Sequence, residues 1–367
     1  MTDLNQPAPG ASREDIDTPC LLVDLDVFES NVRKMSAYCS EHGLAWRPHA
    51  KCHKSPDIAR EVMAAGAIGL TCAKLGEAEV MAAAGVKDLL IANPLVGVLK
   101  LRRLAALRKI ADPIAVVDHP DHVDALSAAL SPERPVRTMI EVDIGMSRCG
   151  VEGGRAAVEL ARRIDGSAAL EFAGIMGYEG HLLRVEGPGE KDKAIAESIG
   201  LLAVTKQALL QAGLPCPIVS AGGTGSYEIT ARQPALTEIQ AGGGIFMDLM
   251  YREQCGVRSL EYALTILASV TSRPAPDRAI IDAGRKTMNM EVHVPEVKGR
   301  SDLHIQSLSA EHGILEVSGE SGPAVGERIE LIPGYGDFTT VLHDRFHCLR
   351  DGRLEAVWPL EARGRLA

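Results

Sequence analysis

Residues 69–93 read GLTCAKLGEAEVMAAAGVKDLLIAN, and this stretch carries the pattern that decides the fold. The runs Gly69–Ala73 and Leu89–Asn93 are short, apolar and typical of buried strands. Between them, Leu75–Ala84 is rich in Ala and Glu, and its apolar residues recur at the three- and four-residue spacing of a helix. A strand, a helix and a strand in this order predict two parallel strands joined by a right-handed crossover.

The same order recurs on both sides of this stretch. About eight such units over roughly 230 residues predict an α/β fold, a (β/α)8 TIM-like barrel, and an open doubly wound sheet is the alternative. Further strands are expected at Leu21–Asp24, Ala45–Lys51, Ile114–Asp118, Thr138–Asp143, Ala173–Tyr178 and Ile218–Ala221. Further helices are expected at Asp26–Glu41, Pro56–Ala65 and Lys193–Ala212.

The alternation of strands and helices ends after about Tyr251, where strand-like runs are separated by Gly, Pro and Asp turns. These runs predict a C-terminal, mainly β domain after the barrel. They are Tyr262–Thr271, Ala279–Asp282, Leu303–Leu308, Ile314–Val317, Glu327–Ile332 and His347–Leu349, with a hairpin turn at Asp351–Gly352. We expect residues 20–250 to form the barrel, and residues 1–19 and 251–367 to form a β-domain that covers the active site.

Composition excludes several classes of protein. Hydrophobic residues make up 46% and charged residues 24%, as in globular proteins. The net charge of −10 and the lack of a Lys/Arg cluster argue against nucleic-acid binding. No apolar run reaches the roughly 18 residues that cross a membrane, and the N-terminus lacks a secretory pattern. The eight cysteines form no CxxC pair, so we expect reduced thiols in a cytoplasmic protein.

The most unusual cluster, WRPHAKCHK at Trp46–Lys54, closes the second expected strand. Strand alternation would place Arg47, His49, Lys51 and His53 on one face. A lysine that points into a barrel mouth is unfavourable unless it is paired or used covalently. Burial and cationic neighbours would lower its pKa and favour the free amine that attacks an aldehyde. A solvated strand end is the alternative.

Two more clusters follow expected strands, where barrels carry their functional groups. DIGMSRCG at Asp143–Gly150 holds Arg148 between two glycines, where its guanidinium could pair with an anionic oxygen, or form only an exposed turn. SAGGTGS at Ser220–Ser226 lets main-chain N–H groups converge at a helix start, and favours a phosphate site over a plain tight turn. Gly242-Gly243-Gly244 could supply its opposite wall.

A fourth cluster, PGYGDFTT at Pro333–Thr340, lies in the expected β-domain and is followed by His343 and His347. It can reach a barrel site only by folding over the mouth or across a dimer. A Gly-Pro turn with surface histidines is the alternative.

The first three clusters together suit one cofactor. They would place a lysine, an arginine and a phosphate-binding loop at one barrel mouth, as an aldehyde cofactor that carries a phosphate requires.

These residues resemble the fold-type III pyridoxal 5′-phosphate enzymes of the alanine racemase superfamily, and more closely the D-threonine aldolase and D-serine dehydratase branch. The resemblance rests on RPHAKCHK at Arg47–Lys54, SRCG at Ser147–Gly150 and GGTGS at Gly222–Ser226, and it extends from Asp17 to Gly364. It implies that Lys51 is the Schiff-base lysine, and that Arg148 and Tyr178 lie beside the cofactor ring. The implied cofactor-binding set is Lys51, Arg148, Tyr178, Ser220, Gly222, Gly223, Thr224, Gly225, Gly242 and Gly243.

The same resemblance raises the question of a metal. Enzymes of this branch carry His-x-Asp or His-x-Cys where this chain has Tyr335-Gly336-Asp337, and their Asp-Glu-His-Gly appears here as Ala310-Glu311-His312-Gly313. Asp337 is therefore the candidate metal ligand that stays in place. Binding of a divalent ion such as Mg²⁺, Mn²⁺ or Zn²⁺ is an open alternative, with Asp337 and either His343 or His347 as its ligands.

The resemblance implies a lyase that cleaves D-3-hydroxy-amino acids such as D-threonine to glycine and an aldehyde. The implied catalytic residues are Lys51, His49 and Tyr335, with His53 and His181 as other candidates for the base. The alternatives are an amino-acid racemase or epimerase, a D-serine or 3-hydroxyaspartate dehydratase, and a non-enzymatic pyridoxal-phosphate homeostasis protein. A small amino-acid substrate and a homodimer with shared active sites are implied as partners.

Overall fold

The computed structural model describes residues 7–319 and 322–367, and the chain separates into two units. The β-unit comprises Met1–Lys34 and Gly243–Glu361, and the barrel unit comprises Met35–Gly242 and Ala362–Ala367. Helix α1 (Leu25–Glu41) begins in the β-unit and ends in the barrel unit. In the described ranges, no helix combines the length and the apolar character that crossing a bilayer requires.

The stretch from Gly69 to Asn93 folds as predicted. Its two strands pair in parallel, with Leu70 opposite Leu89. The helix between them begins after Lys74 and buries Leu75, Ala78 and Met81, which are three residues apart and so lie on one face. These elements are β3 (Leu70–Cys72), α3 (Leu75–Ala83) and β4 (Asp88–Ile91).

Eight parallel strands form the sheet of the barrel unit, in the order β2-β9-β8-β7-β6-β5-β4-β3. The two ends of this order meet beyond β2, where the Ile68 N–H donates to Trp46 O at 2.9 Å and the Thr71 N–H donates to Pro48 O at 3.0 Å. The sheet therefore curls into the predicted barrel. Its other strands are β2 (Ala45–Trp46), β5 (Asp112–Val117), β6 (Val136–Glu141), β7 (Leu170–Met176), β8 (Ile218–Ala221) and β9 (Glu238–Ile239).

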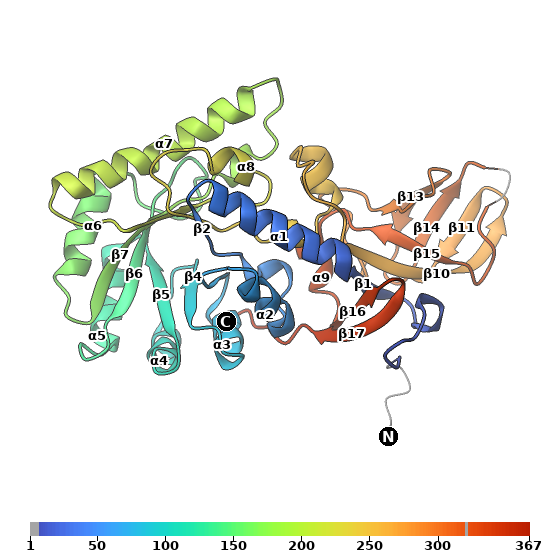
Figure 1. Cartoon of the computed structure of the whole chain (residues 1–367), viewed down its shortest axis with the longest axis horizontal. Helices are drawn as coiled ribbons and strands as arrows, with labels where there is room; N and C mark the ends of the chain where they lie inside the picture. Colours follow the sequence, from blue (N-terminus) through green and yellow to red (C-terminus); the bar gives the residue numbers. More distant parts are fainter. Residues whose placement is uncertain (1–6, 320–321) are drawn as a thin grey trace. The chain divides into compact units, whose positions relative to one another are not determined.

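Helices connect the strands and lie along the outside of this sheet (Figure 1). Side chains from neighbouring strands, including Ile114, Val116 and Met139, pack into one buried apolar cluster. Strands that are covered on both sides in this way present their carboxyl-end loops as the free surface for chemistry. The other helices are α2 (Pro56–Ala64), α4 (Val98–Leu107), α5 (Pro120–Ala129), α6 (Arg155–Asp165), α7 (Glu190–Gln211) and α8 (Tyr227–Thr230).

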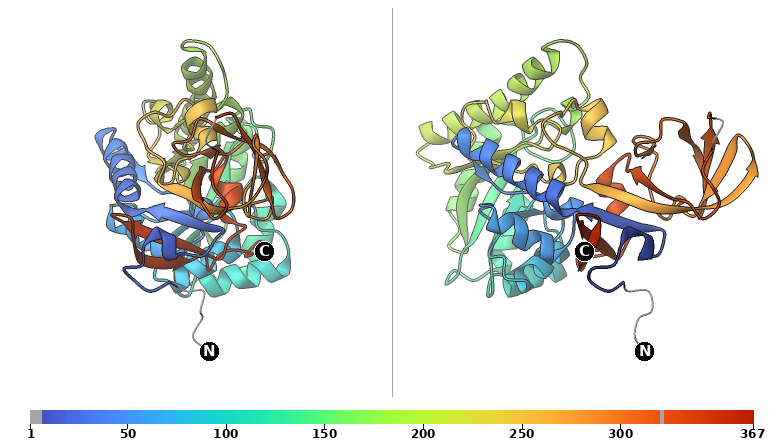
Figure 2. Two further views of the ribbon diagram at one scale, coloured as in Figure 1. Left: turned by 90° about the vertical axis from the view of Figure 1, so that its right-hand side faces the viewer. Right: turned by 45° about the vertical axis from the view of Figure 1, so that its right-hand side comes forward.

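The β-unit is built on a nine-stranded, mostly antiparallel sheet that is strongly twisted (Figure 2). Its main order is β13-β14-β11-β10-β1-β16-β17, with β15 on β10 and β12 on β15. The predicted hairpin at Asp351–Gly352 joins β16 to β17. The elements are β1 (Cys20–Asp24), β10 (Leu264–Ala275), β11 (Arg278–Ile281), β12 (Glu296–Val297), β13 (Leu303–Leu308), β14 (Gly313–Val317), β15 (Arg328–Ile332), α9 (Gly336–Thr340), β16 (Arg345–Arg350) and β17 (Arg353–Pro359).

One strand was expected in the wrong sheet. The run at Leu21–Asp24 was predicted as the first barrel strand, but Leu21 pairs with Ile266 of β10 and with Phe346 of β16 in the β-unit. A fully buried apolar strand has the same pattern in either sheet, so its sequence does not reveal its partners. The eighth barrel strand is instead β9, Glu238–Ile239, which is too short to show a period.

Candidate active site

Lys51 lies on a short turn rather than on a strand. Strand β2 ends at Trp46, and Ala50–Cys52 form a 3₁₀ turn that begins after His49. The expected strand to Lys51 was therefore too long, because the chain turns directly after His49, whose ring accepts the Lys51 N–H. Lys51 and His49 are both partly exposed, whereas Cys52 is buried.

The predicted alternation of four side chains on one face is wrong for Arg47. Its side chain is 1% exposed and is held between two carboxylates. Nε donates to Glu238 Oε1 at 3.0 Å, and Nη1 donates to Asp88 Oδ1 at 2.6 Å. Arg47 thus ties β2 to β9 and β4, and its charge is satisfied inside the barrel wall rather than offered to a ligand.

His49 orients the turn and has a strongly perturbed pKa. Its Nδ1 accepts the main-chain N–H of Lys51 at 3.3 Å. Partial burial of the ring first, and then electrostatic interaction with Lys51, Lys54, His53 and Arg148, hold the pKa of His49 well below 6.5. The imidazole is therefore neutral at neutral pH, which is the form that can accept a proton.

A buried ion pair closes the far side of the Lys51 turn. The backbone of Lys54 is left-handed, with φ of 51°, and its side-chain amine is paired with the carboxylate of Glu77. The side chains are 8% and 1% exposed. Glu77 also accepts the N–H of Ala73 at 2.6 Å, and Lys54 O accepts the N–H of Ala362 at 3.0 Å. The turn is thereby tied to the β3–α3 loop and to the last residues of the chain.

The glycine loop Gly222–Gly225 connects β8 to α8. Gly222 has φ of +88°, a conformation that side chains disfavour. A Cβ at Gly223 would lie 2.9 Å from Cε2 of Tyr178, so the loop backbone passes directly against the tyrosine ring. The predicted phosphate loop and the predicted ring-side tyrosine are therefore neighbours.

The hydroxyl of Ser226, which follows this loop, is engaged within the protein. It donates to Glu179 Oε1 at 2.6 Å, and its oxygen accepts the Gly223 N–H at 3.2 Å. Sequence reasoning missed Glu179 as a member of the site. The signal available was its place directly after Tyr178, beyond the end of a buried strand.

Arg148 is near both Tyr178 and Glu141. Its Cζ lies 5.8 Å from the centroid of the Tyr178 ring, within cation–π range. Its Nη2 lies 3.6 Å from Glu141 Oε1. These three side chains line a small hollow at the end of β6, together with Cys149. His181, a candidate base, is exposed, and its Nε2 is 2.8 Å from where a Cβ at Gly145 would lie.

Gly242 leaves room for the histidine turn. A Cβ at this position would lie 2.3 Å from the carbonyl oxygen of His49, and the His49 N–H donates to Gln240 O at 3.0 Å. Gly243 belongs to the β-unit, where a Cβ would lie 2.8 Å from Cε2 of Tyr251. Gly242 is therefore needed for the close approach of two backbones, and Gly243 for the close approach of the Tyr251 ring.

Tyr335 and Asp337 lie together in the β-unit. The Tyr335 hydroxyl donates to Asp337 Oδ2 at 3.0 Å. Nearby, burial raises the pKa of Asp248 to about 7, against the effect of N–H donors from Gly336 and Tyr251. This is a cluster of proton-carrying groups, and Asp248 was not foreseen from the sequence.

The residues around Asp337 do not fit a metal ion. Across residues 7–319 and 322–367, no three His, Cys, Asp or Glu side chains are grouped as a metal site. The alternative ligands are used by main-chain groups: His343 Nε2 contacts Thr287 O at 2.8 Å, and His347 Nδ1 contacts Leu21 O at 3.3 Å. The expectation of Asp337 as a ligand has no support from this donor set, and we derive no step through a metal.

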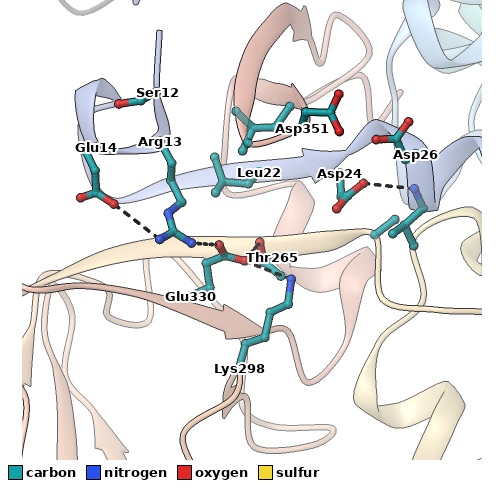
Figure 3. Close-up of a pocket in the computed structure, with 14 residues that line it drawn as sticks. Ser12, Arg13, Glu14, Leu22, Asp24, Asp26, Thr265, Lys298, Glu330 and Asp351 are labelled. Carbon is teal, nitrogen blue, oxygen red and sulfur yellow. Dashed lines mark hydrogen bonds and ion pairs between the residues drawn. The ribbon is translucent and has the colours of Figure 1, made fainter.

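A cavity of about 520 Å³ lies in the β-unit (Figure 3). The carboxylate of Glu330 on its wall accepts from Arg13 Nη1 at 2.6 Å and from Lys298 Nζ at 3.2 Å. Burial alone would raise the pKa of Glu330, but Lys298 and Arg13 hold it below its ordinary value. The predicted site residues do not line this cavity. Its lining is Ser12, Arg13, Glu14, Leu22, Asp24, Asp26, Val27, Ala263, Thr265, Lys298, Glu330, Leu349, Asp351 and Gly352.

Comparison with known proteins places this geometry in a family. The family model described as the N-terminal domain of alanine racemase matches residues 23–250. The chain belongs to the alanine racemase N-terminal-domain family. A second model, described as a putative serine dehydratase domain, matches residues 263–349. The resemblance drawn from Arg47–Lys54 and the glycine loop is therefore confirmed.

Two curated relatives match this member of the alanine racemase family over nearly its whole length. A D-threonine aldolase from Arthrobacter sp. is 37% identical, with 97% of this chain and 95% of the relative covered. A 3-hydroxy-D-aspartate aldolase from Paracoccus denitrificans is 36% identical, with the same coverage. The crystal structure of D-threonine aldolase from Filomicrobium marinum has a TM-score of 0.95 and 36% identity, covering 98% of this chain and all of that one.

Proposed function

We propose that this chain is a pyridoxal 5′-phosphate-dependent aldolase that cleaves D-3-hydroxy-amino acids of the D-threonine kind to glycine and an aldehyde. The observation that carries the proposal is the 37% identity with a D-threonine aldolase over 97% of the chain, which includes both units. A non-enzymatic barrel protein would explain only the barrel part of that similarity.

The residues present fit the cofactor. Lys51 would hold its aldehyde carbon, and the loop Gly222–Gly225 would receive its phosphate beside the start of α8. A Cβ at Gly223 would lie 2.9 Å from Cε2 of Tyr178, so glycine is needed for the loop to pass beside that ring. When bound, pyridoxal 5′-phosphate supplies a conjugated ring that accepts the electrons left on the α-carbon of a substrate.

Arg148 would balance negative charge beside the ring. Its guanidinium lies within cation–π range of the Tyr178 ring. Glu141 contacts the same arginine, and burial raises the pKa of that carboxyl. We propose that Arg148 pairs with the ring oxygen of the cofactor, and that Glu141 orients the arginine.

His49 would take the proton of the substrate β-hydroxyl. The ring is neutral at neutral pH because its pKa lies well below 6.5. Acceptance at Nε2 requires the ring hydrogen on Nδ1, and hence the loss of the bond from the Lys51 N–H. That bond measures 3.3 Å, which is long for a hydrogen bond, so losing it is inexpensive. Tyr335, hydrogen-bonded to Asp337, is proposed as a second proton carrier.

We further propose a homodimer with shared active sites, as the membership of the alanine racemase N-terminal-domain family implies. We also propose a cytoplasmic location, since the eight cysteines are free thiols and seven of them are buried.

The reaction is tested by its products. Purified enzyme is incubated with D-threonine and D-phenylserine, and aldehyde and glycine are measured in equal amounts, with the L-isomers as controls. Ammonia and a 2-oxo acid instead would indicate a dehydratase, which the match to a serine dehydratase domain keeps as the second candidate. Loss of optical activity without cleavage would indicate a racemase. Absence of aldehyde from every D-3-hydroxy-amino acid would refute the proposal.

A further inference from the structure

Glu179 is a fully buried carboxylate with no part in the reaction proposed above. It follows Tyr178 beyond β7 and is 0% exposed. A buried carboxylate is unfavourable unless several donors satisfy it. Its donors therefore indicate what the residue does.

All of these donors belong to the glycine loop and the helix that follows it. Oε1 accepts from the Ser226 hydroxyl at 2.6 Å and from the Thr230 hydroxyl at 2.6 Å. Oε2 faces the main-chain N–H of Gly222 at 3.4 Å. One carboxylate thus contacts the first residue of the loop, the residue that follows the loop and the last residue of α8.

The loop is also held from the outside. Lys191, at the start of α7, donates to the carbonyl oxygen of Gly225 at 2.7 Å. A loop with three glycines among its four residues is costly to order, because glycine loses more backbone freedom than any other residue. Contacts that fix its two ends reduce that loss before an anion arrives.

We propose that Glu179 is a positioning residue that preorganises the glycine loop for the phosphate of the cofactor. Glu179 acts through Ser226, Thr230 and Gly222, which it holds in place. The inference rests on the proposed function, since it takes the anion to be the phosphate of pyridoxal 5′-phosphate. The consequence is specific: the network supports recognition of the phosphate and leaves binding of the pyridine ring and the aldehyde unchanged.

The test compares pyridoxal 5′-phosphate with pyridoxal, which lacks the phosphate. Full-length protein is freed of cofactor by dialysis, and the Kd of each compound is measured by titration. The variants are Ser226→Ala and Thr230→Val, each of which removes one donor, and Glu179→Ala and Glu179→Gln. Thr138→Val is the matched control, because Thr138 is equally buried and its hydroxyl donates only to Val136 O at 3.1 Å, away from the loop.

We expect Ser226→Ala and Thr230→Val each to weaken pyridoxal 5′-phosphate binding about tenfold, as for loss of a hydrogen bond to a charged group, with pyridoxal binding unchanged. Glu179→Ala should weaken the binding of pyridoxal 5′-phosphate more than either of these two changes. Glu179→Gln should keep most of the preference for pyridoxal 5′-phosphate over pyridoxal, because the amide Oε1 can still accept from both hydroxyls.

The proposal is overturned if Ser226→Ala and Thr230→Val, folded as judged by circular dichroism, keep the wild-type ratio of the two Kd values. It is also overturned if both Kd values rise in parallel, since a merely structural role would have that effect. Failure of the wild-type protein to bind pyridoxal 5′-phosphate would instead refute the proposed function. The two failures are therefore distinguishable.

Discussion

At the scale of one residue, His49 shows how the surroundings of an imidazole keep it neutral and able to accept a proton. Burial lowers the pKa of its ring, and four nearby cationic or titrating groups lower it further. The direction matters, because a lowered pKa keeps the imidazole neutral as the pH falls through 6.5. A solvent-exposed histidine would already be half protonated there.

We predict that the acid limb of the kcat/KM profile lies below pH 6.5. Above that pH the neutral form of His49 is fully present, and activity falls only as the pH drops through the lowered pKa. His49→Gln should remove this limb and reduce kcat by about 10²–10⁴-fold, the usual contribution of a general base. An acid limb centred at pH 6.5 or above, or one that persists in the variant, would contradict this role.

The Lys54–Glu77 pair makes a second residue-scale prediction. Removal of one partner leaves an uncompensated buried charge and should lower the free energy of unfolding by about 3–5 kcal/mol, whereas removal of both should cost less. The measurement is a double-mutant cycle with Lys54→Met and Glu77→Gln, followed by urea unfolding. Simple additivity of the two single changes would show that the pair is not coupled.

At the scale of elements, close backbone approaches decide where glycine is required. Gly242→Ala would place a Cβ 2.3 Å from the His49 carbonyl oxygen, so one of the two backbones must move. We predict loss of cofactor binding, measured as absorbance of the bound cofactor, together with a lowered Tm. The matched control is Gly200→Ala in α7, where a Cβ would meet nothing within 4 Å. This change should raise helix stability by up to about 1 kcal/mol. Equal effects of the two changes would contradict the packing argument.

Elements with a clear period could be predicted from the sequence. The α3 segment and its flanking strands were foreseen because Leu75, Ala78 and Met81 repeat at helical spacing. The sheet assignment of β1 could not be foreseen, because burial on both faces erases the information about partners. The position of Lys51 on a turn was missed for a local reason, since the chain turns directly after His49, whose ring accepts the Lys51 N–H. Arg47 was misread because its partners, Asp88 and Glu238, are far from it in the sequence.

At the scale of the whole molecule, the two units contribute different chemistry. The barrel unit carries Lys51, Arg148 and the glycine loop, whereas the β-unit carries Tyr335 and Asp337. Sequence motifs identified the barrel residues because glycine-rich and cationic clusters follow strands. Glu179 and Asp248 were missed because a single carboxylate gives no motif, and only its burial and donors reveal its role.

The donor set in the β-unit leads to a prediction about metal dependence. We expect the wild-type enzyme to keep its activity on D-threonine after dialysis against EDTA, because the Tyr335 hydroxyl donates to the Asp337 carboxylate and position 335 offers no imidazole ligand. Tyr335→His restores the His-x-Asp pattern, and its activity should rise when Mn²⁺ is added. Activity assays with and without Mn²⁺ on both proteins decide the point. Complete inactivation of the wild type by EDTA, reversed by Mn²⁺, would contradict it.

The central claim is that the amine of Lys51 holds the cofactor. Borohydride treatment of the purified enzyme fixes the cofactor covalently on the amine that carries it, and mass spectrometry of the digested protein locates the pyridoxyl group. The account predicts this group on Lys51 alone. A label on Lys54 or another lysine, or no label on any peptide, would contradict it.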